Sequence, residues 1–149
     1  MSISEFCNRD VVSATRDTSV IEAAALMRQH HVGDVMVVEE VHGQRKPVGI
    51  VTDRDLVVEV MASGLDPSQL KVGDLVSRPL VTIDEGASYA ETVGLMSVKG
   101  VRRMPVVGRA GELIGIITLD DMLWQLAGPL AALAGLTERG RSFESKTRK

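Results

Sequence analysis

The sequence predicts an α+β fold built from two copies of one unit, each with the element order β-α-β-β-α. A seven-residue pattern occurs at residues 49–55 and again at 115–121: glycine, two β-branched residues, threonine, two variable residues and aspartate. The same order of helix-start and strand signals surrounds each copy. Such self-similarity is typical of a duplicated structural unit.

The first helix of each unit begins at a serine. Ser19 with Glu22, and Ser88 with Glu91, have the spacing of a capping box, in which the hydroxyl and the carboxylate satisfy free backbone N–H groups. Apolar residues then recur with helical period up to Met27 and Met96. Both segments are therefore predicted to be amphipathic helices.

Short runs rich in β-branched residues follow each of these helices and predict two strands joined as a hairpin. A shorter strand is expected before each first helix, and a second helix after each hairpin. The predicted strands are residues 11–14, 35–38 and 48–51 in the first unit, and 80–83, 104–107 and 113–117 in the second. The second helices are predicted at residues 56–61 and 122–126.

The predicted organisation places repeat one with its N-terminal lead-in at residues 1–62, and a linker with Gly64 and Pro67 at 63–71. Repeat two occupies residues 72–127. Residues 128–149 are expected to form a C-terminal helix and a basic tail. Gly128 and Pro129 are expected to end the last helix of repeat two, with a packing helix at residues 130–136 and a frayed tail from residue 141.

Composition narrows the function classes. The chain has 149 residues, 44% of them hydrophobic, and a net charge of −3. That charge does not favour nucleic acid as a partner. Residues 1–10 lack the basic start and apolar run of a signal peptide, and no segment has the length of a membrane span, so a cytoplasmic protein is expected. A single cysteine, Cys7, forms neither an internal disulfide nor a thiolate metal cluster.

The repeated Thr-x-x-Asp segment is the candidate site. Thr52 and Thr118 stand where a strand passes into a helix N-terminus, which offers unpaired N–H groups and a positive dipole end to a phosphate. Asp55 and Asp121 follow in the first helical turn and provide acceptors for the two hydroxyls of a ribose. The alternative interpretation is that both segments are helix caps without a ligand.

These segments, with residues 32–38 and 101–107, resemble tandem cystathionine-beta-synthase (CBS) domains, also called a Bateman module. The resemblance covers residues 11–126. It implies two repeats that pack sheet to sheet about a pseudo-twofold axis and bind adenosine compounds in two clefts between them. It also implies that modules associate two by two into homodimers.

The resemblance assigns residues from both repeats to each cleft. One cleft is expected to use Ile116, Thr118, Asp121 and Arg103 with Thr15, Val32 and Gly33. The other is expected to use Ile50, Thr52, Asp55 and Asp34 with Thr82, Val101 and Arg102. Arginine at position 103 favours phosphate, whereas Asp34 at the equivalent position repels it. The Thr118/Asp121 cleft is therefore predicted to be the stronger phosphate site, with Arg54 partly compensating in the other.

No catalytic or zinc-binding pattern is predicted, and His30 with His31 is interpreted as favourable charge at a helix C-terminus. The leading hypothesis is a regulatory module that requires no cofactor, binds AMP, ADP or ATP, and signals to an unidentified protein effector. The residues do not distinguish these ligands from S-adenosylmethionine or NAD. A ligand-free structural or assembly module is the alternative.

Overall fold

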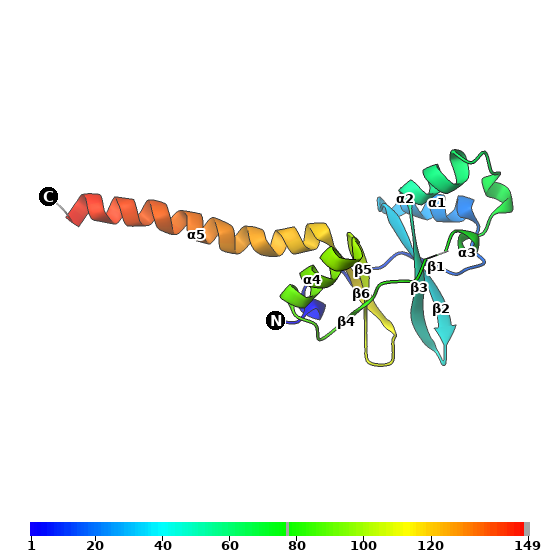
Figure 1. The fold of residues 1–149 in the computed structure, drawn as a ribbon, viewed down its shortest axis with the longest axis horizontal. Coiled ribbons are helices and arrows are strands. Elements are labelled where there is room, and N and C mark those ends of the chain that lie inside the picture. Colours follow the sequence, from blue (N-terminus) through cyan, green and yellow to red (C-terminus); the bar gives the residue numbers. More distant parts are fainter. Residues whose placement is uncertain (77, 148–149) are drawn as a thin grey trace.

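The structure is a computed structural model that describes residues 1–76 and 78–147. It contains two three-stranded sheets, with strand orders β1-β2-β3 and β4-β5-β6 (Figure 1). In each sheet the first strand is parallel to the second, and the second pairs antiparallel with the third. The strands are β1 (Ser13–Ala14), β2 (Asp34–Val41), β3 (Gln44–Thr52), β4 (Ile83–Asp84), β5 (Arg103–Val107) and β6 (Leu113–Thr118). The predicted duplicated α+β fold is confirmed.

Both predicted capping boxes are formed. The Ser19 hydroxyl accepts from the backbone N–H of Glu22 at 3.1 Å, and the Ser88 hydroxyl accepts from that of Glu91 at 3.2 Å. The α-helices are α1 (Val20–His30), α2 (Asp53–Asp55), α3 (Val72–Leu75), α4 (Tyr89–Lys99) and α5 (Leu119–Thr147). Two short 3-10 segments, η1 (Ile3–Glu5) and η3 (Pro67–Gln69), and one π-helical segment, η2 (Leu56–Met61), complete the helical elements.

The two repeats are alike in detail and share an apolar interface. Their hairpins carry a register shift at equivalent places, between Val37 and Val38 and between Val106 and Val107. Met36 and Val38 of β2 form one buried cluster with Ile116 of β6. The sheets thus pack against each other through alternate strand residues, the arrangement expected of a pseudo-twofold pair.

The segments that lead into the repeats are exchanged. Ile3, which precedes repeat one, is fully buried in the core of repeat two beside Met104 and Ile117. Val72, which precedes repeat two, is fully buried in the core of repeat one. Each lead-in is fixed by an equivalent backbone hydrogen bond, from Ile3 N–H to Ala87 O and from Val72 N–H to Thr18 O, both 2.8 Å. Each core is therefore completed by the other repeat's lead-in.

The predicted end of the last helix at Gly128-Pro129 is wrong. Helix α5 continues through Pro129 to Thr147, so the expected separate helix at residues 130–136 and most of the frayed tail belong to one 29-residue helix. Proline removes a single helical hydrogen bond, and the helix-forming run Leu130–Ala134 follows it at once.

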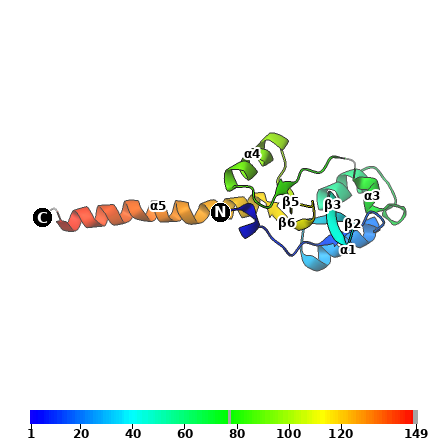
Figure 2. The ribbon, with the colours of Figure 1, turned by 90° about the horizontal axis from the view of Figure 1, so that it is seen from below.

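Beyond its base, α5 projects away from the body, as both views show (Figures 1 and 2). Residues 148–149 of the predicted tail lie outside the described residues. Within the described part of the chain, no helix is both long and apolar enough to cross a membrane.

Candidate functional site

The Thr52/Asp55 segment forms the start of a helix directly after β3. The Thr52 hydroxyl accepts from the Asp55 N–H at 3.1 Å, and Asp55 Oδ2 accepts from the Thr52 N–H at 2.8 Å. Both residues are half-buried. This reciprocal cap, which the strand-to-helix pattern predicts, fixes the threonine and the carboxylate beside each other. Both residues lie beside a pocket that residues of repeat two also line.

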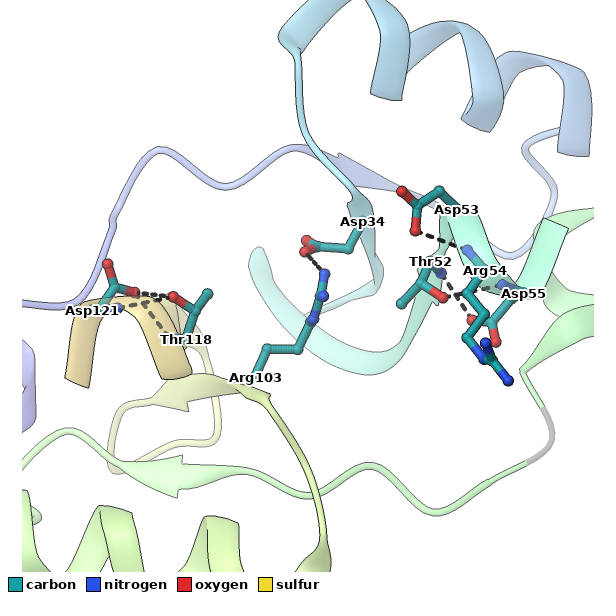
Figure 3. Close-up of polar contacts among 8 residues, drawn as sticks. All are labelled: Asp34, Thr52, Asp53, Arg54, Asp55, Arg103, Thr118 and Asp121. Carbon is teal, nitrogen blue, oxygen red and sulfur yellow. Dashed lines mark hydrogen bonds and ion pairs between the residues drawn. The ribbon is translucent and has the colours of Figure 1, made fainter. Parts of the chain in front are cut away.

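The Thr118/Asp121 segment repeats this geometry after β6. Asp121 Oδ2 accepts from the Thr118 N–H and from the Thr118 hydroxyl, both at 2.8 Å, and the Asp121 N–H donates to that hydroxyl at 3.2 Å (Figure 3). The two caps share both hydrogen bonds that involve backbone N–H groups, and the Thr118 cap adds the bond from hydroxyl to carboxylate. Their surroundings also differ.

A pocket of about 550 Å³ opens beside the Thr52/Asp55 cap. Repeat one contributes Ile50, Thr52 and Asp55 to its lining, and repeat two contributes Val101, Arg102 and Arg103. The structure thus brings together residues from both repeats, five of which were assigned to this cleft. Thr82 does not line the pocket, although its neighbours Leu80 and Val81 do, and Arg54 lies on the exposed surface outside it.

Arg103 lies on a different cleft from the one predicted. Its guanidinium donates to the Asp34 carboxylate, and its side chain lines the Thr52/Asp55 pocket rather than accompanying Thr118. In the view of Figure 3 this ion pair lies between the two caps. The predicted ranking of the two clefts depended on the opposite charges of Arg103 and Asp34. Because these charges neutralise each other in one ion pair, they no longer distinguish the clefts.

On the Thr118/Asp121 side, the N-terminal segment covers the edge of β6. Asn8 and Ile116 exchange backbone hydrogen bonds of 2.9 and 2.8 Å. The Ile116 side chain, expected to contact adenine, is buried against Met36 and Val38 instead. Gly115 is required here because a Cβ would approach Asn8 O to 2.6 Å and Cys7 Sγ to 2.7 Å.

The other residues assigned to that cleft remain in repeat one. Thr15 is exposed at the end of β1, where its N–H donates to the Thr18 hydroxyl at 3.1 Å. The Gly33 carbonyl accepts from the Asp53 N–H at 3.0 Å, and Val32 is half-buried at the same helix end. Among the described residues, no hydrogen bond or ion pair joins these three residues to the Thr118/Asp121 cap.

Cys7 lies in the segment that covers β6. Burial raises the pKa of its thiol, the Asp121 carboxylate acts in the same direction, and Arg9 opposes both. A thiol with a raised pKa is a weak nucleophile. The position of Cys7 thus indicates packing rather than chemistry.

The sequence interpretation missed the contribution of the second lead-in to the pocket. Arg78, Pro79 and Leu80 line it from the segment before β4, and Asp74 and Glu59 add carboxylates. Three arginines, Arg78, Arg102 and Arg103, surround the space together with those acids. The signal was available, because Val72-Gly-Asp-Leu-Val resembles Ile3-Ser-Glu-Phe-Cys in its apolar and acidic pattern.

Comparisons with known proteins agree with this architecture. A family model described as CBS domain matches residues 3–62 and 72–128. An uncharacterized protein of Methanopyrus kandleri is 39% identical over 123 residues, which is 83% of this chain and 61% of that protein. The crystal structure of Hypoxic Response Protein I with two coordinated zinc ions is 29% identical, with a TM-score of 0.72 over 83% of this chain and 97% of that one.

A third comparison is the CBS domain pair of protein MJ0100, solved in complex with 5′-methylthioadenosine and S-adenosyl-L-methionine. It is 23% identical, with a TM-score of 0.73, and the match covers 87% of this chain and 98% of that one. At this identity the likeness concerns the fold. The family matches fall on the two halves that the duplication defines and cover most of the sequence, so the chain belongs to the CBS domain family.

Proposed function

We propose that this chain is a regulatory module that binds an adenosine nucleotide, AMP, ADP or ATP, in the Thr52/Asp55 pocket and signals to a partner protein. The observation that carries the proposal is the pocket of about 550 Å³ lined by residues of both repeats. A ligand that contacts both repeats changes their relative arrangement whenever it favours one arrangement energetically. A partner protein then responds to that arrangement.

The lining has the groups that such a ligand requires. Ile50 and Val101 provide apolar surface for adenine. Asp55 uses Oδ2 in the cap, and its second carboxylate oxygen is an acceptor suited to a ribose hydroxyl. Arg78, Arg102 and Arg103 provide guanidinium groups for phosphate.

Isothermal titration calorimetry on a matched pair of variants tests the assignment. Asp55→Asn and Asp121→Asn disturb equivalent caps, but only Asp55 lines the pocket. We expect Asp55→Asn to weaken AMP or ATP binding by about tenfold or more, the cost of a lost hydrogen bond to a charged group. Asp121→Asn should leave binding close to wild type. Equal losses, or a loss confined to Asp121→Asn, would contradict the choice of pocket.

A ligand-free structural or assembly module is the second candidate. The observation that favours it is that each Thr/Asp pair already satisfies its own helix start. Thermal unfolding with AMP, ADP, ATP, S-adenosylmethionine and NAD separates the two functions. A ligand at one hundred times its Kd adds about 2.7 kcal/mol, which corresponds to a Tm increase of roughly 5–10 °C. No shift with any of these compounds would favour the structural module.

The proposal has three further parts, which concern location, catalysis and assembly. We propose that the module is cytoplasmic, catalyses no reaction and functions as a homodimer. Incubation with ATP followed by product analysis tests the second point, because an enzyme would release ADP, AMP or pyrophosphate.

A further inference from the structure

The Arg103 side chain lies between a carboxylate and the pocket. Its guanidinium donates to the Asp34 carboxylate, and the residue also lines the Thr52/Asp55 pocket. Asp34 is not among the described residues that line this pocket. Figure 3 shows Arg103 extending from the start of β5 toward Asp34 at the start of β2. A ligand in the pocket can therefore reach Arg103 from a side that Asp34 does not occupy.

The Asp34–Arg103 pair also joins the two sheets. Among the residues that the structure describes, it is the one ion pair between a strand of repeat one and a strand of repeat two. The sheets also meet in the apolar cluster of Met36, Val38 and Ile116. Apolar contacts are not directional, whereas a guanidinium and a carboxylate meet in a defined geometry. The ion pair is therefore the contact that best defines how one repeat is oriented on the other.

A phosphate in the pocket competes with Asp34 for Arg103. Guanidinium groups bind carboxylates and phosphates in the same forked geometry, and a phosphate at neutral pH carries more negative charge than a carboxylate. Arg78 and Arg102 line the same pocket and add to the attraction for phosphate. The Asp34 side chain is 19% exposed, so water can solvate its carboxylate once the pair separates. Adenosine without phosphate offers no anion to Arg103 and leaves the pair in place.

We propose that the Asp34–Arg103 pair makes the module respond to phosphorylated ligands selectively, an inference that rests on the proposed nucleotide binding. A phosphorylated adenosine ligand takes Arg103 away from Asp34, and an unphosphorylated one does not. Two ligands that both fill the pocket then leave the contact between the repeats in different states. The phosphate thereby favours one arrangement of the repeats energetically, which a regulatory signal requires. Asp34 is a specificity-determining residue, because the ligand must compete with its carboxylate.

Divergence of the repeats assigns this response to the Thr52/Asp55 pocket. Repeat one carries Gly33 and Asp34 where repeat two carries Arg102 and Arg103. Both arginines line the Thr52/Asp55 pocket, so a phosphate bound there meets them. If the two residues of the ion pair are exchanged, the pair and the net charge are kept, but position 103 no longer offers a guanidinium to the pocket.

The exchanged variant, Asp34→Arg with Arg103→Asp, tests the specificity. By titration calorimetry on the full chain, its loss of ATP affinity should exceed its loss of adenosine affinity by about tenfold or more, the cost of a hydrogen bond to a charged group. The control is the same exchange in the exposed pair, Arg16→Glu with Glu39→Arg, which should keep the wild-type ratio of the two Kd values. A wild-type ratio in Asp34→Arg with Arg103→Asp would overturn the proposal.

A double-mutant cycle of unfolding tests whether Arg103 changes partner. Asp34→Asn, Arg103→Gln and the double variant give the interaction between the two side chains as a factor in the unfolding equilibrium constant. This factor should be about fivefold without ligand and in saturating adenosine, and should fall to about one in saturating ATP. A factor that persists in ATP would overturn this inference and leave the proposed nucleotide binding intact. If neither ATP nor adenosine raises the Tm of wild type, the proposed function fails and this inference fails with it.

Discussion

Asp34 and Arg103 occupy the same position in the two repeats, and they form an ion pair with each other. A contact between equivalent residues lies at the pseudo-twofold axis that relates the repeats. Their side chains are 19% and 32% exposed, so water screens the pair only partly. Two identical repeats would place two aspartates or two arginines at this point, and these would repel each other. The pair therefore depends on the divergence of the two halves.

Asp34→Asn should lower the free energy of unfolding by about 1–2 kcal/mol, because it leaves the partly buried guanidinium of Arg103 without its counter-charge. Urea denaturation measures this loss. Glu39→Gln is the control, since it removes the exposed Arg16–Glu39 pair, whose side chains are 46% and 48% exposed. That variant should lose less than about 0.5 kcal/mol. Equal losses of unfolding free energy in the two variants would show that the Asp34–Arg103 pair stabilises the fold no more than the exposed Arg16–Glu39 pair does.

Asp34→Asn should also change nucleotide binding, if the proposed function holds. Arg103 lines the pocket, and without Asp34 its charge is no longer neutralised. We expect the Kd for ATP to fall by roughly three- to tenfold at low ionic strength, and by less at high salt, where charges are screened. Titration calorimetry at two salt concentrations checks this expectation. Weaker binding in the variant would mean that Asp34 itself contributes to the ligand site.

Local sequence patterns predicted the helices and strands of each repeat. They did not predict contacts between residues that are far apart in the sequence. Ser19 and Ser88 identified the helix starts because a capping box acts within four residues. The exchange of Ile3 and Val72 between repeats was missed, since two short lead-ins of weak similarity do not reveal which core they enter. Asp34 and Arg103 were aligned correctly but assigned to opposite clefts, because only the position of the axis brings them together.

Gly115→Ala should destabilise the fold by about 1–3 kcal/mol, the usual cost of overpacking. The new methyl group would meet Asn8 O at 2.6 Å and Cys7 Sγ at 2.7 Å, so the N-terminal segment must move off β6. Thermal unfolding measures the loss, and faster hydrogen exchange at the Asn8 amide reports the displacement. Gly94→Ala in α4 is the control, because an added Cβ there would meet no described atom within 4 Å beyond the backbone of its own helix, and the substitution should be neutral or stabilising.

Ile3→Ala and Val72→Ala test the exchange of lead-ins. Each removes fully buried side-chain volume and should cost about 2–4 kcal/mol. The distinctive result is where protection is lost. Ile3→Ala should accelerate amide exchange in β5 and β6, and Val72→Ala should do so in β2 and β3. Loosening of β2 and β3 by Ile3→Ala would contradict the exchanged arrangement.

The capping box of α4 should make stability depend on acid pH. The backbone N–H of Ser88, donating at 2.7 Å, lowers the pKa of Glu91 below its ordinary 4.5, and the Ser88 hydroxyl adds to the effect. A carboxyl whose pKa is lower in the folded state stabilises the fold above its unfolded pKa, and this contribution disappears as pH falls through the folded pKa. The difference in Tm between wild type and Glu91→Gln should therefore shrink as pH falls from about 6 to about 3. Glu138→Gln removes the same charge from the exposed part of α5 and controls for net charge. A difference that stays constant or grows on acidification would contradict the stabilising role of the ionised carboxylate.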